Sequence, residues 1–172
     1  MDLHSLLRAQ LNQAHGLLDE VVRACPEEAL HARGEGWTIK PIAHIYAHTL
    51  YGEDALVHGM LLGKPPLFHS AGWAARLQVT PPADGRGDPD WSAHGPLDLS
   101  TLCEYAAAVY AATDNYVAAA SDEELGRVID PGFAPPQPVA EFVSTLLVWH
   151  VTNHQGEIAA LKGVQGLQGL PF

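Results

Sequence analysis

Apolar positions recur along the chain with the spacing of amphipathic helices. In the first segment they fall three or four residues apart from Leu3 to Val22, and the pattern stops before Pro26. The positions that share this face are Leu3, Leu7, Leu11, Ala14, Leu18, Val21 and Val22. We therefore expect a long first helix, followed by a connection to Trp37 that contains a short helical turn at 27–31.

A second apolar pattern predicts a helix that ends near Gly63. Thr38 is a suitable N-cap for it, Pro41 is tolerated in a first turn, and Pro65-Pro66 prevents its continuation. Its apolar face consists of Ile42, Ile45, Tyr46, Thr49, Leu56 and Met60.

Residues 64–98 predict a long irregular connection, because six of the 13 prolines lie in this stretch. One helical turn is expected at Trp73–Leu77. Loops of this length are uncommon in compact domains and usually lie over a site or at a partner surface.

Two further helices are expected. Thr101 and Glu104 have the spacing of a capping box at the start of the third helix, and Ser121 and Glu124 repeat it before a short extra turn. The face of the third helix consists of Leu102, Ala106, Val109, Ala112, Tyr116 and Ala120. A loop is then expected over 131–138.

The fourth long helix is predicted to begin at Val139 and to end at Lys162-Gly163. Its apolar positions are Phe142, Val143, Leu146, Leu147, Val151, Ile158 and Leu161. The glycine-punctuated apolar tail, 164–172, is expected to pack against the helices. With no strand-like alternation of useful length, the sequence predicts an all-α four-helix bundle as one domain over 1–172, with a long crossover loop between helices two and three.

Composition narrows the classes of function. Apolar residues make up 47% of the 172 residues and charged residues 17%, as in a globular protein. Acidic residues outnumber basic ones 20 to 9 without a basic cluster, which argues against nucleic-acid binding. No signal peptide or membrane span is predicted, and Cys25 and Cys103 stand isolated, so we expect a cytoplasmic protein with buried thiols.

Ten histidines offer candidate chemistry. Six of them occupy polar or loop contexts and are expected to be solvated: His4, His15, His31, His58, His69 and His94. His150 and His154 differ, because they lie four residues apart in an otherwise apolar segment and so share one helix face. Burying two imidazoles is unfavourable unless each has a partner, and a shared metal ion can supply it; backbone carbonyls or water are the alternative partners.

A third ligand would have to come from another helix, and the second helix offers His44 and His48 on one face. Periodicity alone does not separate these two. The segment from His150 to His154 has the spacing of a zinc-protease helix but lacks the Glu after its first His, which argues against that class.

Several motifs resemble the DinB/YfiT-like superfamily. They are Trp149-His150, His154-Gln-Gly-Glu-Ile158, Leu161-Lys-Gly163 and the terminal Gly-Leu-Pro-Phe172, together with Ala47-His48-Thr-Leu-Tyr-Gly-Glu53-Asp54, Gly63-Lys-Pro-Pro66 and Gly72-Trp-Ala-Ala-Arg-Leu77. The resemblance covers nearly the whole chain, and its helix-four motif is the most specific part.

The resemblance implies a site of three histidines, which falls on His48, His150 and His154. The Glu-Asp pair five and six residues after His48 favours that residue. The family's tryptophan, however, usually precedes its helix-two ligand by eight residues, whereas Trp37 precedes His44 by seven and His48 by eleven. His44 therefore remains the alternative ligand, or a residue that supports the site or the core.

For function, the resemblance implies a divalent transition metal, with zinc or nickel as the usual ions. Relatives are similar to thiol S-transferases and isomerases that use bacillithiol or mycothiol, and others to metal-dependent hydrolases. We therefore expect an enzyme acting on a small molecule, with a low-molecular-weight thiol as a candidate substrate and a homodimer as the assembly. A non-catalytic metal-binding or stress-associated interaction protein is the alternative.

Two further groups bear on the expected site. Glu157 shares a face with both helix-four histidines and is expected to orient a ligand or to have a structural role, rather than to act as a base. Four aromatic residues are candidates for a pocket or for the core: Tyr46, Tyr51, Trp73 and Trp149.

Overall fold

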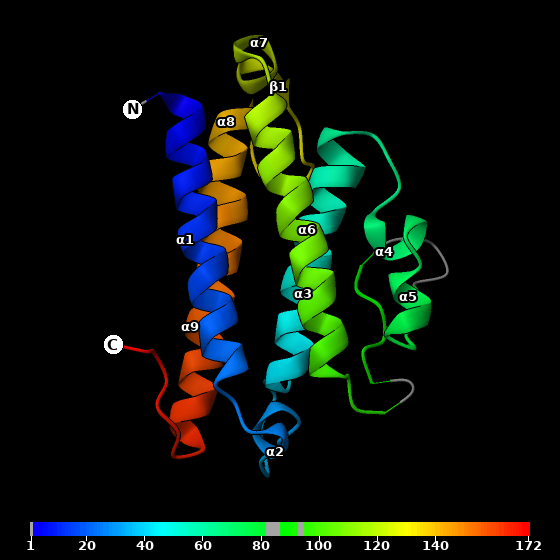
Figure 1. The fold of residues 1–172 in the computed structure, drawn as a ribbon, viewed down its shortest axis with the longest axis vertical. Coiled ribbons are helices and arrows are strands. Elements are labelled where there is room, and N and C mark those ends of the chain that lie inside the picture. Colours follow the sequence, from blue (N-terminus) through cyan, green and yellow to red (C-terminus); the bar gives the residue numbers. More distant parts are fainter. Residues whose placement is uncertain (1, 82–86, 93–94) are drawn as a thin grey trace.

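Four long helical stretches form the predicted all-α bundle (Figure 1). The computed structural model describes residues 2–81, 87–92 and 95–172. The long stretches are α1 (Leu3–Arg23), α3 (Ile42–Asp54) continued by the π-helical η1 (Ala55–Leu61), α6 (Leu99–Ala119), and α8 (Val139–Glu141) continued by the π-helical η2 (Phe142–Leu147) and by α9 (Val148–Val164). The short elements are α2 (Glu27–Leu30), α4 (Leu67–Ser70), α5 (Trp73–Arg76), α7 (Asp122–Gly126), β1 (Val128–Ile129) and β2 (Gln137–Pro138).

Successive long helices of the bundle are antiparallel, except that α3 and α6 are parallel. In Figure 1, α1 runs down, α3 and α6 both run up, and α9 runs down again. Because α3 and α6 are parallel, the chain between them must return along the whole bundle, and it does so through α4 and α5 on the outside. This segment is the predicted crossover between helices two and three, and α4 is a helical turn that the sequence pattern did not predict.

The core follows the predicted apolar faces. Helix α1 packs against α6 and α9, and α3 packs against the same two helices. On α1 the predicted positions are buried except Leu3, which is 46% exposed near the end of the bundle. Two apolar clusters fill the interior: the larger one includes Leu18, Tyr46 and Tyr105, and the other includes Leu7 and Phe142.

Two predicted helix starts are wrong. Thr38 does not cap the second helix, because Pro41 disfavours helical backbone at Lys40 and the helix begins only at Ile42. Thr101 does not cap the third helix either. Asp98 stands three residues earlier, and its carboxylate accepts a hydrogen bond from the Thr101 backbone N–H at 2.7 Å. The cap at Ser121 is confirmed, since its side chain accepts from the Glu124 N–H.

The region expected to be a loop over 131–138 contains a small departure. Strands β1 and β2 pair antiparallel, with Val128 opposite Pro138 and Ile129 opposite Gln137. Strands of two residues are too short to show the alternation of apolar and polar positions that would predict them from the sequence. The tail packs only in part, because Leu170 contacts the main core whereas Val164 and Phe172 are 67% and 86% exposed.

The expectation that six histidines are solvated is wrong for two of those that the structure describes. His15 is only 6% exposed, and its Nε2 lies 2.9 Å from the Glu53 carboxylate. His58 is nearly buried, with its Nδ1 2.8 Å from Asp54. His15 lies on the buried face of α1, and His58 lies in η1. Histidine is a polar residue, and for that reason the sequence did not indicate that these two side chains are buried. His94 lies outside the described residues.

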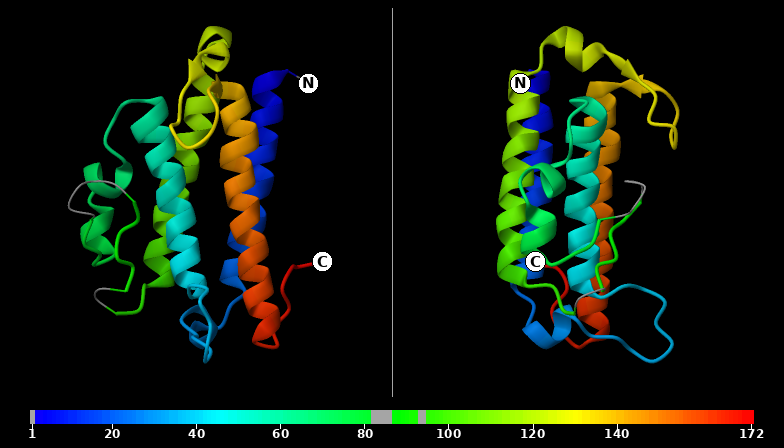
Figure 2. Two further views of the ribbon diagram at one scale, coloured as in Figure 1. Left: turned by 180° about the vertical axis from the view of Figure 1, so that it is seen from behind. Right: turned by 90° about the vertical axis from the view of Figure 1, so that its right-hand side faces the viewer.

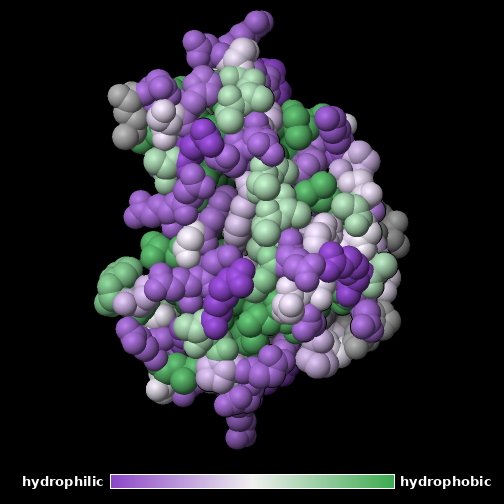
Figure 3. Space-filling view, in the orientation of Figure 1, coloured by the Kyte–Doolittle hydropathy of each residue, from purple (hydrophilic) through white to green (hydrophobic). Residues whose placement is uncertain are grey.

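The surface and the thiols complete the description. On the face drawn in Figure 3, hydrophilic residues are interspersed with smaller groups of apolar ones. Cys25 is buried as expected, whereas Cys103 is half-buried, and both are free thiols. No helix in the described part of the chain is long and apolar enough to span a membrane.

Candidate metal centre

Three imidazoles from two helices converge on the side of the bundle where α3 faces α9. Each of His48, His150 and His154 offers one ring nitrogen, and these nitrogens all lie within 4.8 Å of one another. The ring centroids are 4.8 Å apart for His48 and His154 and 4.7 Å apart for His150 and His154. These are the three residues on which the family resemblance placed the site, with His44 as the alternative to His48, and their rings lie close together.

The local sequence explains this convergence. A spacing of four residues places His150 and His154 one turn apart on the same face of α9. Helix α3 runs antiparallel to α9 and presents His48 opposite them. Gly52 makes the close approach possible, because a Cβ at this position would lie 2.8 Å from the His150 Cε1.

His44 is placed apart from the three rings. It lies one turn before His48 on α3, is 8% exposed, and lines the adjoining cavity instead of joining the group. Burial lowers its pKa to about 4, with further lowering by Arg33, His31 and Lys40. A neutral imidazole at this place can contact a molecule in the cavity.

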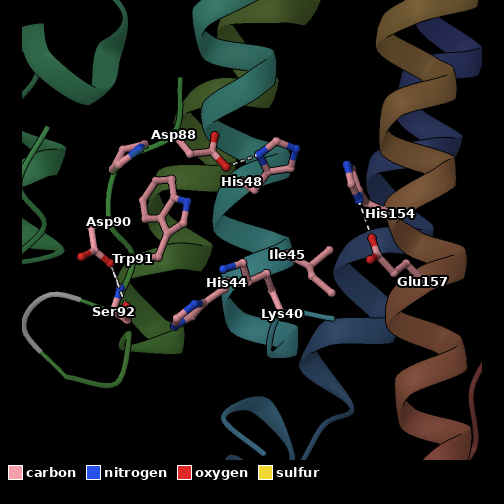
Figure 4. A pocket seen from close by; sticks show the side chains of 11 residues that line it. Lys40, His44, Ile45, His48, Asp88, Asp90, Trp91, Ser92, His154 and Glu157 are labelled. Carbon is pink, nitrogen blue, oxygen red and sulfur yellow. Dashed lines mark hydrogen bonds and ion pairs between the residues drawn. The ribbon is translucent and has the colours of Figure 1, made fainter. Parts of the chain in front are cut away.

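Carboxylates hold two of the three rings in place. Asp88 lies 2.6 Å from the His48 Nδ1, and Glu157 lies 2.8 Å from the His154 Nδ1 (Figure 4). Because an ionised carboxylate can only accept, each Nδ1 carries a proton, and Nε2 is the nitrogen of each ring that can bind a metal ion. Such carboxylate–histidine pairs are common behind metal ligands, where they fix the tautomer and the ring orientation.

The third ring lacks such a partner among the described residues. The His150 Nδ1 is buried without a hydrogen bond there, and its Nε2 lies 3.3 Å from the His48 Nε2. Desolvation lowers the pKa of His150 to about 4, and the neighbouring His154 and His48 lower it further. The ring is therefore neutral at pH 7, which is the form that binds a metal ion.

The donor set fits a divalent transition metal. Lone pairs of neutral imidazoles repel one another at short range unless a cation or a proton lies between them, and two carboxylates stand behind the rings. The hydrogen bond to Asp88 raises the pKa of His48, so a proton competes with a metal for this ring. Three imidazoles suit zinc, nickel and other first-row ions and leave coordination positions open.

A cavity of about 440 Å³ opens beside His48 and His154. The crossover segment forms one wall of it through Asp88, Asp90 and Trp91 (Figure 4). Lys40, two residues before α3, and His44, in the first turn of α3, also line it. The expectation that residues 64–98 lie over a site therefore agrees with the structure. The sequence did not predict that Asp88 contacts His48, because its neighbours in the sequence do not distinguish it from other acidic residues in loops.

Of the four candidate aromatics, three belong to the main core cluster and two line a cavity, because Tyr51 does both. Tyr46 and Trp73 are buried in the main cluster. Tyr51 and Trp149 line a second cavity beside His150. Glu157 contacts His154, as expected of a residue that orients a ring.

Comparison with known proteins identifies the family. The family model of the DinB superfamily matches residues 10–158. The chain belongs to the DinB superfamily. None of the curated proteins matches it in sequence. A solved structure, described as a conserved protein from Enterococcus faecalis, superposes with a TM-score of 0.80 at 22% identity and covers 96% of this chain and 99% of its own. At that identity the likeness shows the fold alone.

Proposed function

We propose that this DinB-superfamily protein is a metal-dependent enzyme that acts on small molecules. His48, His150 and His154 would hold one divalent transition metal ion, zinc or nickel. The observation that carries the proposal is the convergence of three imidazoles, two of them held through Nδ1 by Asp88 and Glu157. His15 and His58 also contact carboxylates, but the described residues place three ring nitrogens within 4.8 Å of one another at His48, His150 and His154.

The residues of the site have separate tasks in this proposal. Three protein ligands leave coordination positions for water or substrate, as in catalytic and not structural sites, and a bound ion would lower the pKa of a coordinated water or thiol and act as a Lewis acid. Asp88 and Glu157 hold the His48 and His154 rings through Nδ1 and so fix their orientation, which leaves Nε2 as the nitrogen that would bind the ion. Gly52 leaves room for the His150 ring.

The cavity of about 440 Å³ suits a small molecule with polar groups. Lys40 supplies a cation for a carboxylate or similar anionic group, and the neutral ring of His44 supplies a hydrogen-bonding nitrogen. Trp91, which is 7% exposed, closes part of the wall against water. These groups support a role for His44 in contacting substrate, not in binding the metal.

Among reactions, we propose thiol S-transfer or hydrolysis, with a low-molecular-weight thiol as the candidate substrate. The support is the family resemblance, together with a ligand set whose open positions suit a thiolate or water. A homodimer stays a prediction.

The metal centre is tested by the metal content of the purified protein. Wild type should contain about one transition metal ion per chain, and His150→Ala should lose it because two imidazoles hold an ion weakly. His44→Gln, one turn from His48, is the matched control and should retain the metal. Equal metal in wild type and His150→Ala, measured by inductively coupled plasma mass spectrometry, would contradict the proposal, and loss in His44→Gln would reassign the third ligand.

The activity is tested separately with zinc- or nickel-loaded protein. Mass spectrometry should detect S-conjugates when the protein is supplied with low-molecular-weight thiols and a panel of electrophiles, and His150→Ala should form none.

One observation favours a second candidate function, a non-catalytic metal-binding or stress-associated interaction protein. Asp88 and Glu157, the carboxylates beside the rings, are both bonded to histidines, so neither is free to act as a catalytic base. Inactivity across the panel with metal retained would support that candidate.

A further inference from the structure

A second cavity lies beside His150. Its volume is about 340 Å³, and the His150 ring forms part of its wall. Asp88, which holds the His48 ring, lines both this cavity and the larger one beside His48 and His154. Two separate spaces therefore meet at the same group of imidazoles.

The two cavities differ in chemistry. Charged and hydrogen-bonding groups such as Lys40 and His44 line the first. The second is bounded mainly by apolar side chains, among them Ala55, Leu146 and Trp149. A ligand that filled both would have a polar part and an apolar part, with the reacting atoms between them at the histidines.

Irregular backbone shapes the second cavity. Ala55 belongs to the π-helical segment η1, and Leu146 belongs to the π-helical segment η2, which ends three residues before His150. Such segments interrupt the regular helix and are frequent at functional sites. The loop between β1 and β2, which projects on the α3 and α9 side in Figure 2, adds Phe133 to the wall.

Two large aromatic side chains stand exposed at this cavity. Trp149 is 59% exposed and Phe133 is 63% exposed, although both line it. Exposed aromatic rings around a hollow are favourable surfaces for a planar apolar group, which would remove them from water and stack against them.

We propose that this cavity is the subsite for an apolar, planar group of the substrate that reacts at the three-histidine site. The proposal rests on the metal-dependent function argued above. A volume of about 340 Å³ is at the small end of ligand pockets and fits one aromatic group, and the His150 wall places that group beside the metal ligands. The substrate class is then a small molecule with an aromatic or similarly flat apolar moiety.

Binding of 1-fluoronaphthalene, a neutral planar probe without a metal-binding atom, tests the subsite. Fluorine NMR titrations should show saturable binding to both metal-free and zinc-loaded protein. Trp149→Ala removes a stacking surface and Ala55→Phe fills the cavity, so each should weaken binding at least about fivefold. Val128→Ala, which shortens an exposed apolar side chain outside the cavity, should bind as wild type does. All three variants should keep the zinc content and the circular dichroism of wild type.

Each other outcome overturns a distinct part of the proposal. No saturable binding by a wild type that retains zinc overturns the subsite and leaves the metal centre in place. Probe binding by a protein that takes up no metal overturns the metal-dependent function, and with it the role of the cavity as a substrate subsite. If light scattering shows that Trp149→Ala turns a dimer into a monomer, a second copy of the chain occupies the cavity and the subsite is wrong.

Discussion

At the scale of single residues, Gly52 decides how closely the two ligand-bearing helices can approach. A Cβ on Gly52 would lie 2.8 Å from the His150 Cε1, which is closer than two carbon atoms tolerate. With a Cβ at position 52, the His150 ring would have to turn away from its present place. The absence of a side chain at position 52 is therefore a condition for the geometry of the three rings.

Gly52→Ala should weaken metal binding at least about tenfold, because the His150 ring has to rotate away from His48. Helix propensity alone would favour alanine here by roughly 0.5–1 kcal/mol, so a loss of metal without a loss of stability isolates the clash. Gly59→Ala, at a glycine with no atom within 4 Å of the added Cβ, is the control. Competition with a chromogenic chelator measures both, and equal zinc affinities would contradict the prediction.

The two carboxylates behind the rings make a second prediction at this scale. Asp88→Asn and Glu157→Gln should each lower metal affinity by about 10- to 100-fold, because a neutral amide orients the imidazole less firmly and lowers its basicity. Asp90→Asn is the matched control, since Asp90 lines the same cavity but bonds Ser92 and not a histidine. Isothermal titration with zinc measures the affinities, and an Asp90→Asn loss as large as that of Asp88→Asn would show that cavity charge alone is responsible.

At the scale of elements, the last turn of α3 fixes how this helix is rotated in the bundle. Glu53 is 1% exposed and accepts a hydrogen bond from Thr113 of α6 at 2.6 Å, while it also contacts His15 of α1. Five residues separate Glu53 from His48, which is about 140° around a helix. Anchoring Glu53 between α1 and α6 therefore turns His48 toward α9.

Asp54 attaches the crossover segment to α3, as Glu53 attaches α3 to α1 and α6. It is fully buried, and its carboxylate accepts from the backbone N–H groups of Leu67 and Phe68 and from the Tyr105 hydroxyl at 2.7–2.9 Å. These bonds attach α4, and with it the start of the segment that leads to Asp88, to the bundle. Both members of the Glu-Asp pair after His48 are therefore structural: Glu53 contacts α1 and α6, and Asp54 contacts α4 and α6.

Asp54→Asn should lower the free energy of unfolding by about 2–4 kcal/mol, because one buried acceptor becomes an N–H donor that faces other donors. Urea denaturation of the metal-free protein measures the change. Asp122→Asn, in the first turn of the exposed helix α7, should cost less than about 1 kcal/mol. Comparable losses in the two variants would contradict the role of Asp54 as an anchor.

At the scale of the whole molecule, the metal-free protein should lose stability on acidification. Burial lowers the pKa of His44 to about 4 from an ordinary value of 6.5. Between these pH values the unfolded chain binds a proton that the folded chain does not, so the free energy of unfolding falls as the pH falls. The full contribution is present above pH 6.5, and its loss down to pH 4 amounts to at most about 3 kcal/mol.

The measurement is urea denaturation of chelator-treated protein at several pH values from 7 to 4. His44→Gln should flatten the dependence, although His150, whose pKa is also lowered to about 4, still contributes. A slope in His44→Gln equal to that of wild type would show that His44 does not carry this dependence.

The sequence by itself determined the parts of this protein that depend on neighbours along the chain. Helical periodicity placed four long helices and the crossover, and the i, i+4 spacing placed His150 and His154 on one face, because both follow from a rise and turn that every helix shares. The errors at Thr38 and Thr101 also have local causes, namely Pro41 and the better cap Asp98.

Only the tertiary structure decided the rest. Which of His44 and His48 faces α9 depends on the rotation of α3, which Glu53 sets through contacts with two other helices. Asp88 reaches His48 from 40 residues away along the chain, and the apolar cavity joins η1, η2 and the β1–β2 loop. Such contacts follow from packing between segments that are distant in sequence, and for that reason no local pattern of residues records them.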